Sequence, residues 1–365
     1  MKKNFLSIFI ITFILGFSIL FILLPKKEFS ENENRYLEKF PKFSFNELLN
    51  GKYINDLESY LTDHFPLRDA FMSIKTKYQL LIGQKLINGV YVGKDEYLFQ
   101  KYENPVNTDK LINKLNEFYT NNDINMSIML VPSSGVINTD KLPNNVSFDL
   151  QLETIKYVYD NLKFSGIDVT ESLKEGSKEY EMYYRLDHHW TTYGAYYAYL
   201  EFCKYNDIEP LELNSFRHVT ITNTFNGTLY SKANIYSYKP DKIDIFLNDS
   251  KLSVKYVASN RTTDTLYEDK HLNTKDKYAY FLDGNHPLIQ IINEEQEGEI
   301  LIIKDSYANS FIPFLANHYN KIHVIDLRFY NSSVSSYIEE NNIEKVLFLY
   351  NMQGIDNDTD IYKIK

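Results

Sequence analysis

The stretch that decides the fold runs from Glu299 to Asn351 and reads EILIIKDSYANSFIPFLANHYNKIHVIDLRFYNSSVSSYIEENNIEKVLFLYN. Three apolar runs, ILII, IHVI and VLFLY, alternate with two stretches of helical length. Because buried parallel strands read as continuous apolar runs joined through helices, this alternation predicts βαβ units and a parallel sheet. Ligands bind such sheets at the carboxyl ends of the strands, and Ser306 follows the first run at that end.

The same alternation extends upstream. Helical spacing predicts helices near 109–121 and 150–163, and apolar runs at 126–131 and 167–170 predict two more strands. Before them, VYVGKDEYLFQ at 90–100 places two aromatic runs around a polar turn, which predicts a β-hairpin. The expected fold class is α/β, with a mostly parallel sheet flanked by helices.

Composition divides the chain into three parts. Residues 1–27 form an apolar N-terminal segment, and the spacing of apolar residues in 28–85 predicts a juxtamembrane helical segment. Residues 86–365 form the globular body. Within this body, about 210–277 is rich in Asn, Thr, Asp and Tyr with weak periodicity, which predicts an insertion rich in loops or β-structure.

The N-terminal segment predicts a membrane helix. Residues 4–24, NFLSIFIITFILGFSILFILL, carry no charge and have the length of about 20 residues that crosses a bilayer. Signal peptides have a shorter apolar region, about 7–15 residues, and a small-x-small exit, whereas this one ends in FILLPKKEF. An uncleaved single-pass anchor is therefore favoured. Lysines flank both ends, so the charge bias does not fix the orientation, and export of the body is expected from the signal-anchor layout.

The overall charge and cysteine content exclude other classes. A formal net charge of −10 without a basic cluster argues against a nucleic-acid-binding protein. The single cysteine, Cys203, excludes an intrachain disulfide. The 31 Tyr and 24 Phe residues suit a surface that stacks on sugars.

A chemically distinctive cluster lies at 186–199, where LDHHWTTYGAYYAY places an Asp, two His and the single Trp before a predicted helix. A serine nucleophile needs a base within hydrogen-bond reach and a group that orients that base. His189 can take the proton from Ser306. Asp187 lies two residues before His189, which on extended chain puts both on one side.

The cluster has other interpretations. In the catalytic one, His188 points elsewhere, and Trp190 packs under the loop or offers its ring to a sugar. In a purely structural one, Asp187 or Thr191 caps the helix and Trp190 is core. A metal site is not predicted, because adjacent His residues rarely aim at one ion and no second cluster supports His188 and His189.

Beyond these residues, LDHHW resembles the signature of the bacterial DHHW family, which is similar to the alginate O-acetyltransferases of the SGNH-hydrolase superfamily. Further blocks resemble that family in the same order over roughly residues 30–352. They include ENENRYLEKFPKFS, YLTDHFPLRDAF, VYVGKDEYLFQ, FNGTLYSKA, YFLDGNHPLIQI, KDSYANSF, VIDLRFYN and VLFLYN.

The resemblance implies an SGNH-hydrolase-like, flavodoxin-like fold in circularly permuted order, because Asp187 and His189 precede Ser306. These three residues are the implied catalytic triad. The chain departs from the family in having KDS where Gly-x-Ser is commoner, so Lys304 must find room at a crowded strand end.

Additional site residues are expected nearby. Asn285 has the side chain of an oxyanion donor, and Gly284 allows close backbone approach, although GNHP with His286 also reads as a turn. Arg328 lies just past a predicted strand end, where it can hold a carbonyl oxygen or a sugar hydroxyl, or form a surface ion pair.

The function that the resemblance implies is O-acetylation of a cell-surface or secreted polysaccharide, by a domain outside a bacterial cell membrane. No cofactor is expected, because the acetyl donor would arrive through a membrane-bound O-acyltransferase (MBOAT-like) partner. Two alternatives stay open. The same triad would serve a carbohydrate O-acetyl esterase, and an aromatic-rich crevice would serve a non-catalytic glycan-binding protein.

Overall fold

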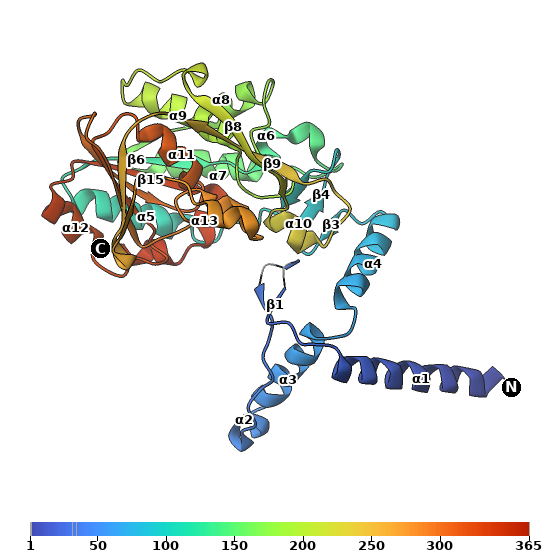
Figure 1. The fold of residues 1–365 in the computed structure, drawn as a ribbon. Coiled ribbons are helices and arrows are strands. Elements are labelled where there is room, and N and C mark those ends of the chain that lie inside the picture. The colour runs from blue at the N-terminus through green and yellow to red at the C-terminus, as the bar shows by residue number, and fades with distance from the viewer. Residues whose placement is uncertain (1, 31, 34, 365) are drawn as a thin grey trace. The chain divides into compact units, whose positions relative to one another are not determined.

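The computed structural model describes residues 2–30, 32–33 and 35–364 (Figure 1). It contains two compact units. The smaller comprises Met1–Asn88 and Tyr230–Tyr238, and the larger comprises Gly89–Leu229 and Lys239–Lys365.

The smaller unit is mostly helical. Its first helix, α1 (Lys2–Leu23), contains the apolar stretch Phe5–Leu23, which has a mean hydropathy of 2.8 and is long enough to cross a membrane. Arg35 donates to both oxygens of the Asp63 carboxylate, at 2.9 and 2.5 Å. The other elements are β1 (Phe29–Ser30), β2 (Arg35–Tyr36), α2 (Phe45–Leu49), α3 (Lys52–Asp63), α4 (Arg68–Leu81) and β3 (Leu86–Ile87).

The larger unit is built on an eight-stranded sheet with the order β11-β10-β12-β14-β13-β15-β6-β7. The five strands from β14 to β7 are parallel, and β12, β10 and β11 are antiparallel to their neighbours. The strands are β6 (Asn125–Val131), β7 (Ser165–Gly166), β10 (Leu252–Tyr256), β11 (Arg261–Thr263), β12 (Leu288–Asn293), β13 (Glu299–Lys304), β14 (Lys321–Ile325) and β15 (Lys345–Asn351). The expected α/β class is confirmed, but the sheet is mixed.

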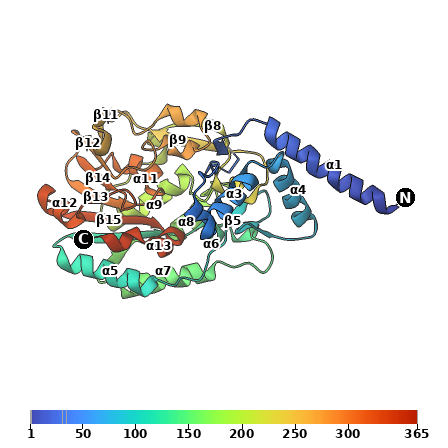
Figure 2. The ribbon, with the colours of Figure 1, turned by 90° about the horizontal axis from the view of Figure 1, so that it is seen from below.

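Helices cover both faces of this sheet (Figure 2). Along β13, Ile300 and Ile302 pack with one set of helices and Leu301 and Ile303 with the other, since neighbouring side chains point to opposite faces. The first set is α6 (Ser134–Ile137), α8 (Thr170–Gly176), α9 (Thr192–Tyr205) and α11 (Ala308–Leu315). The second set is α5 (Thr108–Asn121), α7 (Asp149–Asn161), α12 (Val334–Asn341) and α13 (Met352–Asn357).

The other strands of the larger unit pair antiparallel outside the main sheet. β4 (Val90–Val92) and β5 (Leu98–Gln100) pair antiparallel, which confirms the predicted hairpin. β8 (Arg217–Phe225) and β9 (Asp241–Leu247) form a separate antiparallel pair. Between them lies α10 (Thr228–Ala233).

Two expectations differ from the structure. The strand predicted at 167–170 lies earlier, because β7 pairs with β6 at Ser165 and Gly166 and the Ile167 N–H still donates to the Ile128 carbonyl (2.7 Å). The chain then turns, and the Asp168 carboxylate accepts a hydrogen bond from the Thr170 N–H (2.8 Å) at the start of α8. The region 210–277, expected as an insertion, also supplies β10 and β11 to the main sheet. Their antiparallel addition beside β12 makes the sheet mixed.

Candidate active site

Ser306 lies at the carboxyl end of β13, between the strand and α11. The Asp305 carboxylate accepts hydrogen bonds from the backbone N–H groups of Tyr307 (2.9 Å) and Asn351 (2.8 Å). These bonds fix the turn and tie it to the end of β15. The Ser306 N–H donates to no acceptor in the described part of the chain, so it is available to a ligand.

The loop that carries Asp187 and His189 is closed by an antiparallel bridge between Tyr183 and Trp190. Beneath it, the Trp190 indole Nε1 donates to the Tyr307 carbonyl oxygen and to Ser310 Oγ, both at 2.9 Å. Trp190 therefore fastens the loop to the start of α11. Its ring is completely buried, which fits the expectation that Trp190 packs under the loop and not the alternative that it offers its ring to a sugar.

Asp187, His189 and Ser306 are brought together in one hydrogen-bonded chain. His189 Nδ1 lies 2.6 Å from Asp187 Oδ1, and His189 Nε2 lies 2.7 Å from Ser306 Oγ. The His189 backbone N–H also donates to Asp187 Oδ1 at 2.9 Å. With Asp187 ionised, Nδ1 carries the ring proton and Nε2 accepts from the serine hydroxyl.

The environment of Asp187 keeps it ionised. Burial alone would raise the pKa of the Asp187 carboxyl, but the neighbouring His188 and His189 and the Thr228 backbone N–H hold that pKa below its ordinary value. The Thr228 N–H and hydroxyl donate to Asp187 Oδ2 at 2.7 and 3.0 Å. Gly227 packs directly on Asp187, where a Cβ would lie 2.2 Å from the Asp187 Cβ.

Aromatic packing fixes the plane of the His189 ring. The Tyr278 ring stacks on it with centroids 3.8 Å apart and an interplanar angle of 10°. The Tyr278 hydroxyl and Ser310 Oγ lie 2.9 Å apart, in the group that also holds Trp190. His189 can therefore keep one orientation while a proton moves through Nε2.

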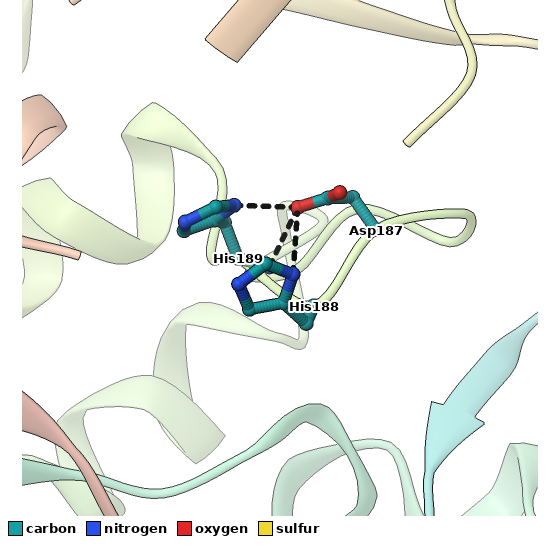
Figure 3. A group of neighbouring side chains, drawn as sticks. All are labelled: Asp187, His188 and His189. Atoms are coloured by element: carbon teal, nitrogen blue, oxygen red, sulfur yellow. Dashed lines mark hydrogen bonds and ion pairs between the residues drawn. The ribbon is translucent and has the colours of Figure 1, made fainter. Parts of the chain in front are cut away.

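His188 does not point elsewhere, contrary to expectation. Its ring centroid lies 3.9 Å from that of His189, and its Nδ1 lies 3.6 Å from Asp187 Oδ1 (Figure 3). The Thr228 hydroxyl has one proton, which it gives to Asp187, so His188 Nδ1 donates to this hydroxyl at 2.7 Å.

Asp187, His188 and His189 lie close enough to be considered as metal ligands. However, both Asp187 oxygens already accept two hydrogen bonds each. The His188 Nδ1 is a donor, as shown above. A cation at this group would have to displace the bonds that orient His189, so the donor set fits a hydrogen-bonded triad better than a metal centre.

A pocket of about 400 Å³ opens over Ser306. Arg328, expected at the ligand edge, lines this pocket together with Ser306 and His188. Its guanidinium donates to the completely buried Asp326 through Nε (2.8 Å) and Nη2 (2.5 Å). Burial would lower the pKa of Arg328, but the Asp326 carboxylate raises it, so the cation is retained. The other lining residues include Asp305, Tyr307, Tyr350, Asn351, Asp358 and Asp360.

Gly284 and Asn285 do not join the triad. The Asn285 side-chain oxygen accepts from Lys304 Nζ at 2.7 Å, and the Gly284 carbonyl accepts from the Asn309 side chain at 3.2 Å. No contact with Ser306 is found for either residue in the part of the chain that the structure describes. Asn285, the expected oxyanion donor, instead accepts from Lys304, and Gly284, expected to allow close backbone approach, contacts Asn309.

The Lys304 side chain lies in the interior of the larger unit. It is completely buried and donates to the side-chain oxygens of Asn285 and Asn309, each at 2.7 Å. Asp326 Oδ2 lies 3.5 Å away. Burial, opposed by the attraction of Asp326, lowers the pKa of Lys304 to about 8.

Sequence reasoning did not single out several residues that build the site. Gly227, Thr228, Tyr278 and Tyr307 contact Asp187, His188 or His189 from distant parts of the chain. The sequence feature that could have pointed to two of these residues is the FNGTLYSKA block, which contains Gly227 and Thr228. Both of them contact Asp187. Tyrosines are too common in this chain for two of them to stand out.

Comparison with known proteins gives consistent results. A DHHW family protein from Eubacterium siraeum DSM 15702 is 23% identical, with a TM-score of 0.66 over 76% of this chain and 95% of that structure. Bacillus cereus PatB1, in a structure with a sulfonyl adduct, is 20% identical, with a TM-score of 0.61 over 76% of this chain and 98% of that one. At these identities the likeness shows the fold.

A curated relative is the probable alginate O-acetylase AlgJ of Pseudomonas syringae pv. tomato, which is 23% identical over 178 residues. The match covers 44% of this chain and 44% of the relative, so the chain spans less than half the length of that protein. The family described as DHHW protein matches residues 33–151 and 83–325, most of the chain. The chain therefore belongs to the DHHW family.

Proposed function

We propose that this protein is a membrane-anchored, extracytoplasmic O-acetyltransferase that modifies a cell-surface or secreted polysaccharide through a Ser-His-Asp triad. The observation that carries the proposal is the continuous chain from Asp187 through His189 to Ser306, with contacts of 2.6 and 2.7 Å beside an open pocket. A serine nucleophile needs a base that is itself oriented by a carboxylate, and Ser306 has both in this arrangement.

The chemistry proceeds in two halves. Ser306 Oγ attacks the carbonyl carbon of an acetyl donor while His189 Nε2 takes the hydroxyl proton, which the imidazolium then gives to the departing group. Asp187 stabilises the imidazolium. A sugar hydroxyl then attacks the acetyl-serine, and His189 removes its proton, so that the acetyl ester passes to the sugar and Ser306 regains its proton.

The developing oxyanion needs donors near Ser306. The free Ser306 N–H at the strand end meets this requirement, and the Arg328 guanidinium lines the same pocket. Asp326 holds Arg328 by two bonds, which positions its remaining N–H groups. We therefore assign Arg328 to the carbonyl oxygen or to a sugar hydroxyl, and we do not assign the oxyanion to Asn285.

Other parts of the proposal rest on the relatives and on the N-terminal helix. The printed name of AlgJ, alginate O-acetylase, supports a polysaccharide acceptor. The apolar α1 supports an uncleaved anchor in the bacterial cell membrane, with the larger unit outside. An MBOAT-like membrane partner would supply acetyl groups, so that no cofactor is needed. The Asp-His-then-Ser order fits a circularly permuted SGNH-like domain.

Active-site labelling tests the triad. A fluorophosphonate should label the purified full chain, and Ser306→Ala or His189→Ala should abolish labelling while leaving the melting temperature within a few degrees. The matched control is Ser332→Ala, an exposed serine whose loss should leave labelling unchanged. Labelling that persists in Ser306→Ala would refute the nucleophile assignment, and an unlabelled wild-type chain would favour a glycan-binding protein.

Acceptor dependence separates transfer from hydrolysis. The enzyme is incubated with an activated acetyl ester, with and without an oligosaccharide, and acetylated sugar and free acetate are measured. A transferase should form acetylated sugar at the expense of acetate. Acetate release that the oligosaccharide does not change would assign the triad to an esterase instead.

A further inference from the structure

The outward face of α4 is apolar. Phe71, Ile74, Tyr78 and Leu81 recur at the spacing of one helix face and are 42–84% exposed. On the opposite side Thr76 is buried, and its hydroxyl donates to the Ala233 carbonyl at 3.4 Å within the same unit. The apolar stripe of a water-soluble helix normally faces the core, so this stripe requires another environment.

α3 continues the same surface. Ile54, Leu57 and Leu61 lie on one face of this helix, and Ile54 and Leu61 are exposed. A groove of about 690 Å³ runs between α3 and α4. Its apolar lining is formed by Ile54, Leu57, Leu61, Phe65, Phe71 and Met72.

The surface is continuous with the membrane-length helix. The Phe17 ring of α1 lies 5.3 Å from the Phe65 ring and 5.8 Å from the Phe71 ring, at the corner between α3 and α4. Phe17 lies six residues before Leu23, about 9 Å from the end of α1 at 1.5 Å per residue. Helices that lie in a membrane surface bury their apolar face by about 5–10 Å. The distance of about 9 Å between Phe17 and the end of α1 falls within this range.

Charge separates this region from the rest of the chain. Residues 26–88 contain ten basic and nine acidic residues, whereas residues 89–365 contain 27 basic and 40 acidic residues. An anionic lipid surface therefore repels the larger part of the chain but not the segment that carries α3 and α4. The apolar face and the near-zero charge fit a bilayer better than a charged protein surface.

We propose that α3 and α4 lie in the lipid–water interface beside α1, with their exposed apolar face among phospholipid acyl chains, which also enter the groove. This inference rests on the part of the proposed function that makes α1 a membrane anchor. It adds that the juxtamembrane segment is a lipid-binding element and not a solvated stalk. The same lipid contact would hold the anchor helix and the α3–α4 corner at a fixed depth.

Site-specific fluorescence tests the proposal. The full chain carries one cysteine, Cys203, which is buried and whose pKa burial raises to about 12, so maleimides will not react with it. An environment-sensitive maleimide is attached to Leu61→Cys or Ile74→Cys in liposomes containing phosphatidylglycerol. Ser59→Cys is the matched control, because Ser59 is exposed and lies 200° around α3 from Leu61. Ile14→Cys, in α1, reports membrane insertion.

Two quenchers read out depth. Lipids brominated in their acyl chains should quench the labels at 61, 74 and 14, and iodide should quench only the label at 59. In the contrary outcome, iodide quenches the labels at positions 61 and 74 as strongly as the label at 59, while brominated lipid quenches the label at 14. That result would support α1 as a membrane anchor and would contradict the lipid-binding element. Labels at 61 and 74 shielded from both quenchers would mean that protein covers the face, which also overturns it.

Separate measurements test the membrane anchor and the assignment of the triad. A label at position 14 that brominated lipid does not quench would overturn both the anchor and the lipid-binding element. Fluorophosphonate labelling of Ser306 in the same liposomes reports the triad independently. If brominated lipid does not quench the labels at 61 and 74 while Ser306 is still labelled, the lipid-binding element is contradicted and the proposed triad is not affected.

Discussion

Lys304 combines complete burial with a position two residues before Ser306, the proposed nucleophile. An unpaired buried ammonium would be expensive, and here two side-chain amide oxygens and Asp326 receive it. Asp326 in turn holds Arg328, which lines the pocket. The unusual lysine of the KDS motif thus belongs to the network that positions Arg328.

The buried lysine predicts a pH-dependent stability. Its pKa falls from 10.5 to about 8 on folding, so between these pH values the unfolded chain holds a proton that the folded chain has released. Stability must then rise with pH through this window, because the unfolded state binds more protons. The unfolding free energy of the native chain, relative to Lys304→Met, should increase by roughly 3 kcal/mol between pH 8 and 10.5.

Denaturant unfolding at several pH values measures this difference. The tyrosines are the same in both chains and cancel in the comparison. Parallel stability curves for the native chain and Lys304→Met would show that Lys304 stays protonated across the window.

The close packing of Gly227 on Asp187 predicts that a side chain at position 227 will impair catalysis. A Cβ at this position would lie 2.2 Å from Asp187 Cβ and 2.4 Å from Asp187 Oδ2, so Gly227→Ala must displace the carboxylate from His189. A displacement of about 1 Å costs on the order of 100-fold in rate, and the rate of fluorophosphonate labelling should fall accordingly. A melting curve shows that the chain is still folded. An unchanged labelling rate in a folded variant would mean that Asp187 is not needed to orient His189.

At the residue level, the sequence revealed local relations better than distant ones. Asp187 and His189 are two residues apart, so their shared side followed from chain geometry, and the placement of Ser306 followed from the strand before it. Asn285 was a candidate oxyanion donor by residue type alone. Its partner is Lys304, a buried cation 19 residues away that no local pattern can place there.

At the level of elements, strand–helix alternation was readable where strands are buried on both faces. β13, α11, β14, α12 and β15 all appear in the expected stretch, because each strand is a continuous apolar run. Strand direction was not readable at the other edge. β10 and β11 lie within the polar region of weak periodicity, and β10 pairs antiparallel with β12, which itself pairs antiparallel with β14.

The short elements show a second limit. At 167–170 the apolar residues Ile167 and Val169 are buried, as a strand would require, yet the chain turns into α8. The Asp168 side chain accepts from the Thr170 N–H and stabilises this turn. A single side-chain hydrogen bond can thus decide between strand and turn where the apolar run has only two members.

For the whole molecule, the remaining question is on which side of the membrane the larger unit lies, since lysines flank both ends of the apolar segment. The acceptor chemistry requires the outside, because the proposed substrate is a cell-surface or secreted polysaccharide. Cys203 will not react with a maleimide, because it is buried and burial raises its pKa to about 12. A cysteine placed at the exposed Lys251 therefore reports on the larger unit alone.

Intact cells that express Lys251→Cys should react with a membrane-impermeant maleimide, and cells with the native chain should not. The labelled chain should be recovered in the membrane fraction at full length, since an uncleaved α1 retains it. Labelling that appears only after lysis would place the larger unit inside the cell, where a secreted glycan cannot reach Ser306. A shortened labelled chain in the medium would instead show that α1 is removed as a signal sequence, which leaves the triad in place but takes away the anchor.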